Sequence, residues 1–285
     1  MKTPISVDLK GKVCVVTGGG GVLCSTFAKA LASNGAKVAI LDLREEAACA
    51  VADAITAEGG TAIGVACNVL SKDSLETARA VIEEKLGTCD ILLNGAGGNN
   101  PRGTTTKDYL MPEDLEKTVE GVKTFFDLDP EGVKFVFELN FIGTLLPTQV
   151  FAPSMTGKKG SCIINISSMN AFCPLTRIPA YSGAKAAISN FTQWLAVHFS
   201  KVGIRCNAIA PGFFLTNQNH DLMVNPDGTP TERAKKILAG TPMDRFGEPE
   251  ELVGALLFLI DEGCSSFING VVLPVDGGFA AYSGV

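Results

Sequence analysis

The chain alternates short apolar runs with longer segments of helical pattern. The apolar runs cover residues 13–16, 37–41, 62–66, 91–93, 162–166, 205–209 and 271–275. Most are rich in β-branched residues and do not alternate with polar ones, which is typical of strands buried on both faces of a parallel sheet. Helix-length segments such as 44–58, 73–86, 180–199 and 248–262 lie between them. This pattern predicts an α/β fold, a doubly wound parallel sheet of about seven strands with helices on both faces.

One stretch interrupts this rhythm. Residues 99–134 are polar, acidic and rich in turn-forming residues, and they carry no strong periodicity. A segment of this length without a pattern is usually functional, although a surface insertion without a role is the alternative. Because the chain shows no linker, repeat or low-complexity tract, we expect residues 1–285 to form a single domain that carries this insertion.

Composition and charge exclude several classes of protein. Apolar residues make up 46% and charged residues 19%, as in a globular protein, and the net charge of −6 argues against nucleic acid or an anionic membrane as partner. The nine cysteines form no CxxC motif or Cys/His cluster, so we expect neither a metal site nor a disulfide framework. The N-terminus lacks the apolar core of a signal peptide, and the longest apolar run, 255–260, is too short to span a bilayer. We therefore expect a soluble cytoplasmic protein with reduced thiols.

Four consecutive glycines, 18–21, follow the first predicted strand and precede a helical stretch. A strand, a glycine turn and a helix in this order bind a phosphate on exposed backbone N–H groups. Asp42 closes the second predicted strand, where a dinucleotide-binding fold contacts the adenosine ribose. A carboxylate there repels a 2′-phosphate and favours NAD, whereas the nearby Arg44 leaves NADP open. Alternatively, Asp42 only caps the helix that follows.

The ends of the next two predicted strands carry similar features. Asn68 and Val69 follow the third strand, where an amide can reach an adenine, and the run Asn94-Gly95-Ala96-Gly97 follows the fourth. Its small residues allow a ligand to approach the backbone closely. Because ligands of open α/β sheets bind at the carboxyl ends of the strands, the sequence predicts a dinucleotide at this edge.

Tyr181 and Lys185 stand four residues apart and therefore share one helix face. An ammonium beside a phenol, whose ordinary pKa is near 10, stabilises the phenolate and makes it an acid–base catalyst at neutral pH. The spacing alone is a weak signal. Ser168 at the end of the fifth predicted strand and Asn140 upstream strengthen it.

These motifs together resemble the short-chain dehydrogenase/reductase family over nearly the whole chain. The residues that carry the resemblance are Thr17-Gly18 with the glycine loop, Asn94-Gly95-Ala96-Gly97, Asn140, Ser168, Tyr181-x-x-x-Lys185, Pro211-Gly212 and Asp276-Gly277-Gly278. The resemblance implies a Rossmann fold, a nicotinamide cofactor and a catalytic tetrad of Asn140, Ser168, Tyr181 and Lys185. The chain departs from the family's TGxxxGxG pattern, because Val22 and Cys24 replace its last two glycines.

The family's cofactor site carries over to this chain position by position. In it, Lys185 holds the nicotinamide ribose, Ser168 polarises the substrate carbonyl and Asn140 holds a water molecule. The cofactor-binding residues expected on this basis are Gly18, Gly20, Gly21, Val22, Leu23, Asp42, Asn68, Val69, Asn94, Ala96, Gly97, Tyr181, Lys185, Pro211, Gly212, Phe214 and Thr216.

The segment 99–134 and the glycine-loop variant are similar to a subgroup described as D-mannonate oxidoreductases, also called fructuronate reductases. The resemblance implies interconversion of D-mannonate and D-fructuronate, with residues 213–246 as the substrate lid. A sugar acid needs a cation for its carboxylate and polar groups for its hydroxyls. The expected substrate-binding residues are Ser168, Asn170, Arg102, Arg177 and, in the lid, His220.

Other readings remain open from the sequence. The chain resembles enzymes that act on other polyols, steroids or 3-oxoacyl substrates, and a non-catalytic nucleotide sensor is an alternative of another class. The intact tetrad opposes the sensor. Apolar residues around Tyr181 and in the C-terminal tail favour a homodimer or homotetramer.

Overall fold

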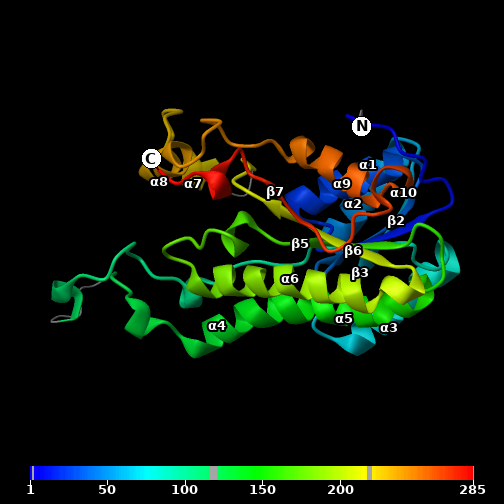
Figure 1. Cartoon of the computed structure of the whole chain (residues 1–285), viewed down its shortest axis with the longest axis horizontal. Coiled ribbons are helices and arrows are strands. Elements are labelled where there is room, and N and C mark those ends of the chain that lie inside the picture. Colours follow the sequence, from blue (N-terminus) through cyan, green and yellow to red (C-terminus); the bar gives the residue numbers. More distant parts are fainter. Residues whose placement is uncertain (2, 116–120, 217–219, 285) are drawn as a thin grey trace.

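The computed structural model describes residues 1, 3–115, 121–216 and 220–284. Within these ranges seven strands form one parallel sheet in the order β3-β2-β1-β4-β5-β6-β7 (Figure 1). The strands are β1 (Val13–Thr17), β2 (Lys37–Asp42), β3 (Thr61–Ala66), β4 (Ile91–Asn94), β5 (Cys162–Ile166), β6 (Arg205–Pro211) and β7 (Val272–Val275). The predicted fold class is confirmed. The order reverses between β1 and β4, which opens a crevice at their carboxyl ends.

Helices cover both faces of the sheet. One face packs against α1 (Val22–Ser33), α2 (Glu45–Ala57) and α9 (Val253–Ile260), and the other against α3 (Lys72–Lys85), α5 (Gly143–Met155) and α6 (Pro179–His198) (Figure 1). Each face has its own apolar core, because successive side chains of a strand point to opposite faces. The expected helix at 248–262 divides into a 3-10 turn (Pro249–Leu252), α9 and the short α10 (Glu262–Ser265).

α4 (Pro130–Phe137) and α5 form one continuous helical run, which the sequence analysis did not predict. A π-helical turn, Glu138–Ile142, joins the two, and Pro147 and Pro153 lie inside α5, where proline normally argues against a helix. By length and composition this run, Pro130–Met155, is the one helix among the described residues that could cross a membrane. Half of its most apolar window is buried within the protein, and the core helices of soluble proteins meet the same criteria.

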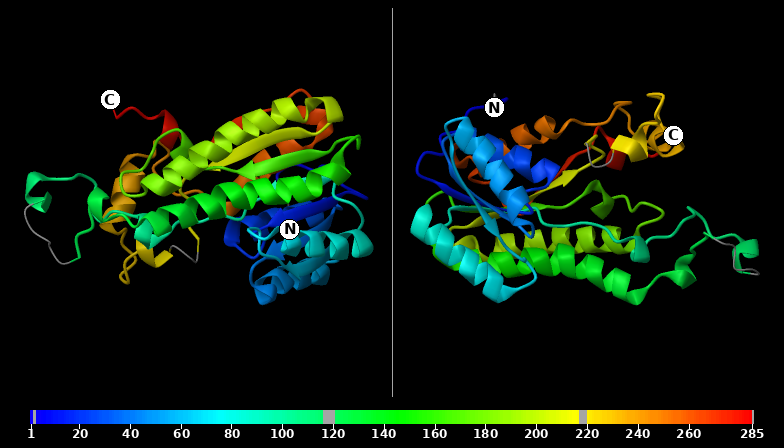
Figure 2. Two further views of the ribbon diagram at one scale, coloured as in Figure 1. Left: turned by 90° about the horizontal axis from the view of Figure 1, so that it is seen from below. Right: turned by 180° about the vertical axis from the view of Figure 1, so that it is seen from behind.

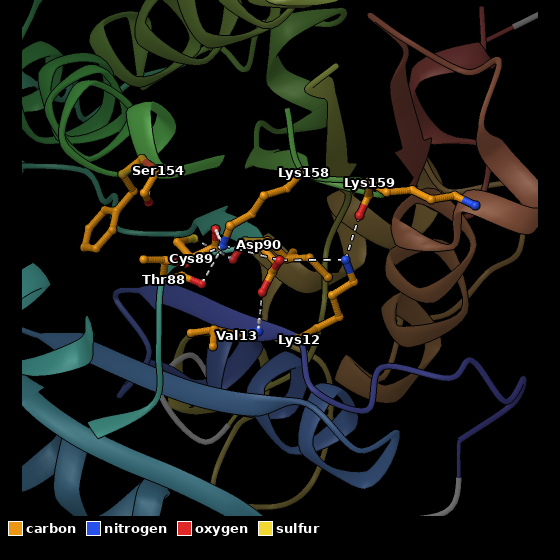
Figure 3. A network of polar contacts seen from close by, with 10 residues as sticks. Lys12, Val13, Thr88, Cys89, Asp90, Ser154, Lys158 and Lys159 are labelled. Carbon is orange, nitrogen blue, oxygen red and sulfur yellow. Dashed lines mark hydrogen bonds and ion pairs between the residues drawn. The ribbon is translucent and has the colours of Figure 1, made fainter. Parts of the chain in front are cut away.

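An ionic network ties the strands together at their amino ends. Asp90, just before β4, accepts a hydrogen bond of 2.9 Å from the Val13 N–H group and lies 3.5 Å from Lys158 Nζ and 3.7 Å from Lys12 Nζ (Figure 3). Lys12 in turn donates to the Lys159 carbonyl oxygen at 2.7 Å. These contacts join β1, β4 and the loop before β5 at the edge opposite the carboxyl-end crevice.

The insertion and the expected substrate lid lie at the other end of the molecule. The described residues of the insertion before α4, 99–115 and 121–129, carry three 3-10 helices, Pro101–Gly103, Pro112–Leu115 and Phe125–Asp127, and extend beyond the body of the sheet (Figures 1 and 2). Residues 130–134, placed in the insertion by the sequence analysis, belong to α4. The segment 213–246 contains α7 (His220–Met223) and α8 (Glu232–Ala239).

Candidate functional site

The glycine loop packs closely against β2 and the loop after β4. Gly18 has a positive φ of 63°, and a Cβ there would lie 2.8 Å from the Ala96 Cα; a Cβ at Gly19 would lie 2.5 Å from Ile40 Cγ2. Any side chain at either position would push the loop away from β2 or from the loop after β4. The four glycines therefore shape a fixed turn.

Cys24 replaces a glycine of the family pattern, and the loop after β4 accommodates it. A Cβ at Gly95 would overlap the Cys24 sulfur, so the thiol fills the space that the missing side chain leaves. Burial raises the pKa of Cys24 to about 12, which keeps it a protonated, packing side chain. The altered loop thus retains close contact between α1 and β4.

The first turn of α1 offers unpaired backbone donors. Its N-cap residue is Gly21, which provides no side-chain oxygen, and no acidic residue lies in the first turn. By contrast, Ser71 caps α3 with its hydroxyl and Thr231 caps α8. The N–H groups at a helix start bind anions when no side chain satisfies them. This turn is therefore suited to a phosphate group.

A cavity of about 490 Å³ lies over this turn at the carboxyl ends of the strands. Of the cofactor-binding residues expected from the sequence, it is lined by Gly18, Gly21, Val22, Leu23, Asp42, Ala96, Gly97, Tyr181, Lys185, Gly212, Phe214 and Thr216. The sequence analysis did not predict six further lining residues, which are Cys24, Arg44, Gly95, Gly98, Ile166 and Phe213.

The other expected cofactor residues lie outside this lining. The Asn94 amide is turned into the protein, where it donates to Thr148 Oγ1 and Asn165 Oδ1 at 3.1 and 2.9 Å. Asn68 accepts a hydrogen bond from the Leu70 N–H group. The remaining three are Gly20, Val69 and Pro211.

Asp42 is held in place by the backbone around it. Its carboxylate accepts hydrogen bonds of 3.1 Å from the N–H groups of Gly20 and Arg44, and the Arg44 guanidinium lies 4.0 Å away. Arg44 is the N-cap residue of α2, and no side chain caps this helix, so the interpretation of Asp42 as a helix cap is wrong. Asp42 lines the cavity instead.

α6 places Tyr181 and Lys185 on the wall of the cavity. The Lys185 Nζ atom lies 5.5 Å from the centroid of the Tyr181 ring and donates a 2.8 Å hydrogen bond to the Ile166 carbonyl oxygen. Burial lowers the pKa of Lys185 to about 8. Burial also raises the pKa of Tyr181 to about 12, and the neighbouring Ser168 hydroxyl acts in the opposite direction. At neutral pH the phenol is therefore protonated and the lysine mostly charged. The lowering of the Tyr181 pKa that the sequence analysis expected from the neighbouring ammonium is not found, because burial outweighs it.

The π-helical turn brings Asn140 to the same place. Its amide nitrogen donates to the Gly98 carbonyl oxygen at 2.8 Å, and a Cβ at Gly97 would lie 2.6 Å from Asn140 Oδ1 and 3.2 Å from Lys185 Nζ. A π turn changes the side-chain phase of a helix and is common at functional sites. The structure thus assembles all four expected tetrad residues in one region.

A second cavity of about 710 Å³ adjoins the first. The two share Tyr181 and Phe213, so the phenol lies at the boundary between them. Its other lining residues are Asn99, Thr104, Thr105, Thr106, Asp108, Leu175, Thr176, Arg177, Ile178, Glu232, Arg233, Lys236, Ile237 and Phe279. The insertion and the 213–246 segment therefore both contribute to its walls.

The expected substrate-binding residues differ in their positions. Arg177 lines the second cavity, whereas Arg102 lies outside its lining with its guanidinium bound to Asp129, the Nε–Oδ2 distance being 2.6 Å. Asn170 is buried, and its backbone N–H group donates to Ser168 Oγ at 3.2 Å. Its side-chain oxygen, Oδ1, has no hydrogen-bond partner among the described residues. His220 is more than half exposed and also lies outside the lining.

Four charged residues that line this cavity were not predicted from the sequence, namely Asp108, Glu232, Arg233 and Lys236. Asp108 accepts hydrogen bonds from Lys236 at 2.8 Å and from Arg177 at 2.6 Å, and these two cations lower its pKa to about 2. Arg233 lies on α8 beside them. Asp108 lies in the stretch without periodicity, whereas Glu232, Arg233 and Lys236 lie on the short amphipathic helix α8, inside the segment expected to be a substrate lid.

No group of three or more His, Cys, Asp or Glu residues among those described could hold a metal ion. All nine cysteines are unpaired in the structure, and six of them are buried.

Comparison with known proteins identifies the family. The profile of the short chain dehydrogenases matches residues 12–226. The chain belongs to the short-chain dehydrogenase family. It is 63% identical over 278 residues to an uncharacterized oxidoreductase of Haemophilus influenzae, covering 98% of this chain and 96% of that protein, and 54% identical to UxuB, an uncharacterized oxidoreductase of Bacillus subtilis, covering 99% of each.

Solved structures agree with this assignment. A crystal structure described as a proposed D-mannonate oxidoreductase from Haemophilus influenzae, with bound NAD, matches with a TM-score of 0.94 and 62% identity over 98% of each chain. The family resemblance stated from the motifs is confirmed. As a short-chain dehydrogenase the protein is an oxidoreductase that acts on CH–OH groups.

The contact between Cys24 and Gly95 is testable by substitution. Gly95→Ala is expected to lower the free energy of unfolding by about 1–3 kcal/mol, because the new methyl group overlaps the sulfur. Cys24→Ala in the same chain removes that overlap and recovers part of the loss. Urea unfolding of both single variants and the double variant measures the coupling. Strictly additive losses would contradict the proposed contact.

Proposed function

We propose that this short-chain dehydrogenase uses NAD(H) to interconvert D-mannonate and D-fructuronate. The observation that carries the proposal is the position of Tyr181 at the boundary of two cavities, one suited to a dinucleotide and one lined by cations and hydroxyl groups. The similar structure with bound NAD supports the cofactor.

The residues of the first cavity fit NAD. The first turn of α1 offers N–H groups to the pyrophosphate, Asp42 offers a carboxylate to the adenosine ribose, and Lys185 offers an ammonium to the nicotinamide ribose. When bound, the cofactor supplies or accepts the hydride.

The protein's own residues manage the proton. In reduction of a ketone the Tyr181 hydroxyl donates its proton to the substrate oxygen, and in oxidation of the alcohol it takes that proton back. The protonated phenol and charged Lys185 expected at neutral pH suit the reductive direction. Ser168 lies beside the phenol and can donate a hydrogen bond to the same oxygen. Asn140 holds the Gly98 backbone next to this group.

The second cavity supports a sugar acid as substrate. Threonine hydroxyls at 104, 105, 106 and 176 and the Asn99 amide can bind substrate hydroxyl groups, while Arg177, Arg233 and Lys236 supply positive charge. Apolar walls formed by Leu175, Ile178 and Ile237 favour a second candidate, a less polar ketone such as a steroid or a 3-oxoacyl compound. A substrate panel separates the two.

Tyr181→Phe tests the chemistry. We expect the wild-type protein to oxidise NADH with D-fructuronate in preference to steroid ketones and 3-oxoacyl substrates. The variant is expected to lose about 10²–10⁴-fold in kcat, because the proton donor is removed, while NADH affinity stays nearly unchanged. Steady-state kinetics and NADH titration by fluorescence measure the two effects. An equal loss of NADH affinity would argue against an acid–base role.

Asp42→Ala tests the choice of cofactor. Loss of the contacts to the ribose is expected to weaken NADH binding by about 10- to 100-fold, and removal of the negative charge relatively favours NADPH. Titration with both cofactors checks this, with Arg44→Ala as the control for a 2′-phosphate contact. A wild-type protein that prefers NADPH would show that Arg44 dominates.

We also propose that the protein works in the cytoplasm as a homodimer or homotetramer. Reduced buried thiols fit a reducing compartment. Ala184 and Ile188 of α6, expected to add to the apolar surface, face the core instead, whereas Trp194 and Val197 are exposed. Light scattering at micromolar concentration is expected to show an oligomer, and Val197→Glu to weaken it. A monomeric wild-type protein would contradict this proposal.

A further inference from the structure

α8 presents two cations to the second cavity from one of its faces. Arg233 and Lys236 are three residues apart, and both line the cavity together with Ile237. The neighbouring Ala234 is fully buried and packs in an apolar cluster with Met223. Because this packing fixes the rotation of the helix, the two cations are held toward the cavity.

Two of the three cations in the cavity wall are already neutralised in part. Asp108 binds Arg177 through Oδ1 at 2.6 Å and Lys236 through Oδ2 at 2.8 Å. Thr176 donates a further hydrogen bond to Oδ1 at 3.1 Å. Asp108 is therefore a positioning residue that joins the insertion, the loop before α6 and α8.

Arg233 has no such partner. It makes no hydrogen bond or ion pair with any residue that the structure describes. The adjacent carboxylate, Glu232, lies 2.7 Å from Lys235, which is outside the cavity lining. Of the cations in this wall, Arg233 is thus the one with no anion bound to it in the described chain.

We infer that Arg233 is the residue that binds the carboxylate of the substrate, which rests on the proposed function in taking that substrate to be a sugar acid. A substrate carboxylate placed against Arg177 or Lys236 would lie beside the negative charge of Asp108 and be repelled by it. Arg233 is not bound to Asp108, and the adjacent Glu232, which also lines the cavity, is paired with Lys235. The planar guanidinium of Arg233 can bind a carboxylate through two parallel hydrogen bonds.

The test compares a charged and an uncharged substrate. The variants are Arg233→Ala, Arg233→Lys and, as a control at an exposed lysine outside the cavity lining, Lys201→Ala. With D-fructuronate, Arg233→Ala is expected to lower kcat/KM by about 10- to 100-fold, chiefly through KM, because a charge-assisted contact is lost. With D-fructose the loss is expected to be small, and NADH affinity and Tm are expected to stay unchanged.

The two remaining variants sharpen the assignment. Arg233→Lys retains the charge without the paired hydrogen bonds and is expected to fall between Arg233→Ala and the wild-type protein. Lys201→Ala is expected to match the wild type. Calorimetric titration of D-mannonate into the NADH-saturated protein gives the same comparison without turnover.

The outcomes separate this inference from the proposed function. If the wild-type protein reduces D-fructuronate but Arg233→Ala loses nothing, or loses equally on both substrates, the role of Arg233 is overturned and the proposed function stands. If D-fructuronate fails but another oxo acid is reduced in an Arg233-dependent way, the proposed substrate falls and the carboxylate site stands. A wild-type protein that prefers uncharged ketones and binds no D-mannonate overturns both.

Discussion

Two loops, one after β1 and the other after β4, pack backbone against backbone where the strand order of the sheet reverses. The Thr17 hydroxyl accepts hydrogen bonds from the N–H groups of Gly95 and Ala96, at 3.1 and 3.2 Å, and Gly18 lies against Ala96. A side chain at Gly18 would separate the two loops, so this contact requires glycine there. It also fixes the start of α1, whose first residues Val22 and Leu23 line the crevice, so the geometry of the cofactor site depends on it.

The residues of the expected tetrad are held against the same loop after β4 and the end of β5. Lys185 is buried and donates to the Ile166 carbonyl oxygen at the end of β5, and Asn140 holds the loop after β4 through Gly98. A buried ammonium is unfavourable unless it is hydrogen-bonded, so these contacts restrict where Tyr181 and Lys185 lie. The phenol is thereby placed between the two cavities.

The second cavity is organised by charge instead of by backbone packing. Asp108 in the insertion forms ion pairs with Arg177 in the loop before α6 and with Lys236 on α8. It thereby links three segments that are far apart in the sequence. Since exposed ion pairs contribute little to stability, the role of this cluster lies more in positioning the walls of the cavity than in holding the fold.

The sequence by itself determined the sheet and most of its helices, and its resemblance to a known family pointed to the four residues of the expected tetrad. Buried parallel strands and helices leave a local periodicity, and motifs such as Tyr181-x-x-x-Lys185 are readable because their members lie one helix turn apart. The continuous helical run α4–α5 was not predicted, because the prolines inside α5 normally indicate the end of a helix. The π turn that joins the two helices has no recognisable sequence pattern.

Only the tertiary structure decided which charged residues meet. Arg102 and Arg177 are equivalent by residue type, yet one pairs with Asp129 away from the cavity and the other lines it. Asp108 and Lys236 are 128 residues apart in the chain, and Arg233 reaches the same wall from α8. Contacts between segments so distant arise from how the fold brings loops and short helices together, and no local pattern in either segment records its partner.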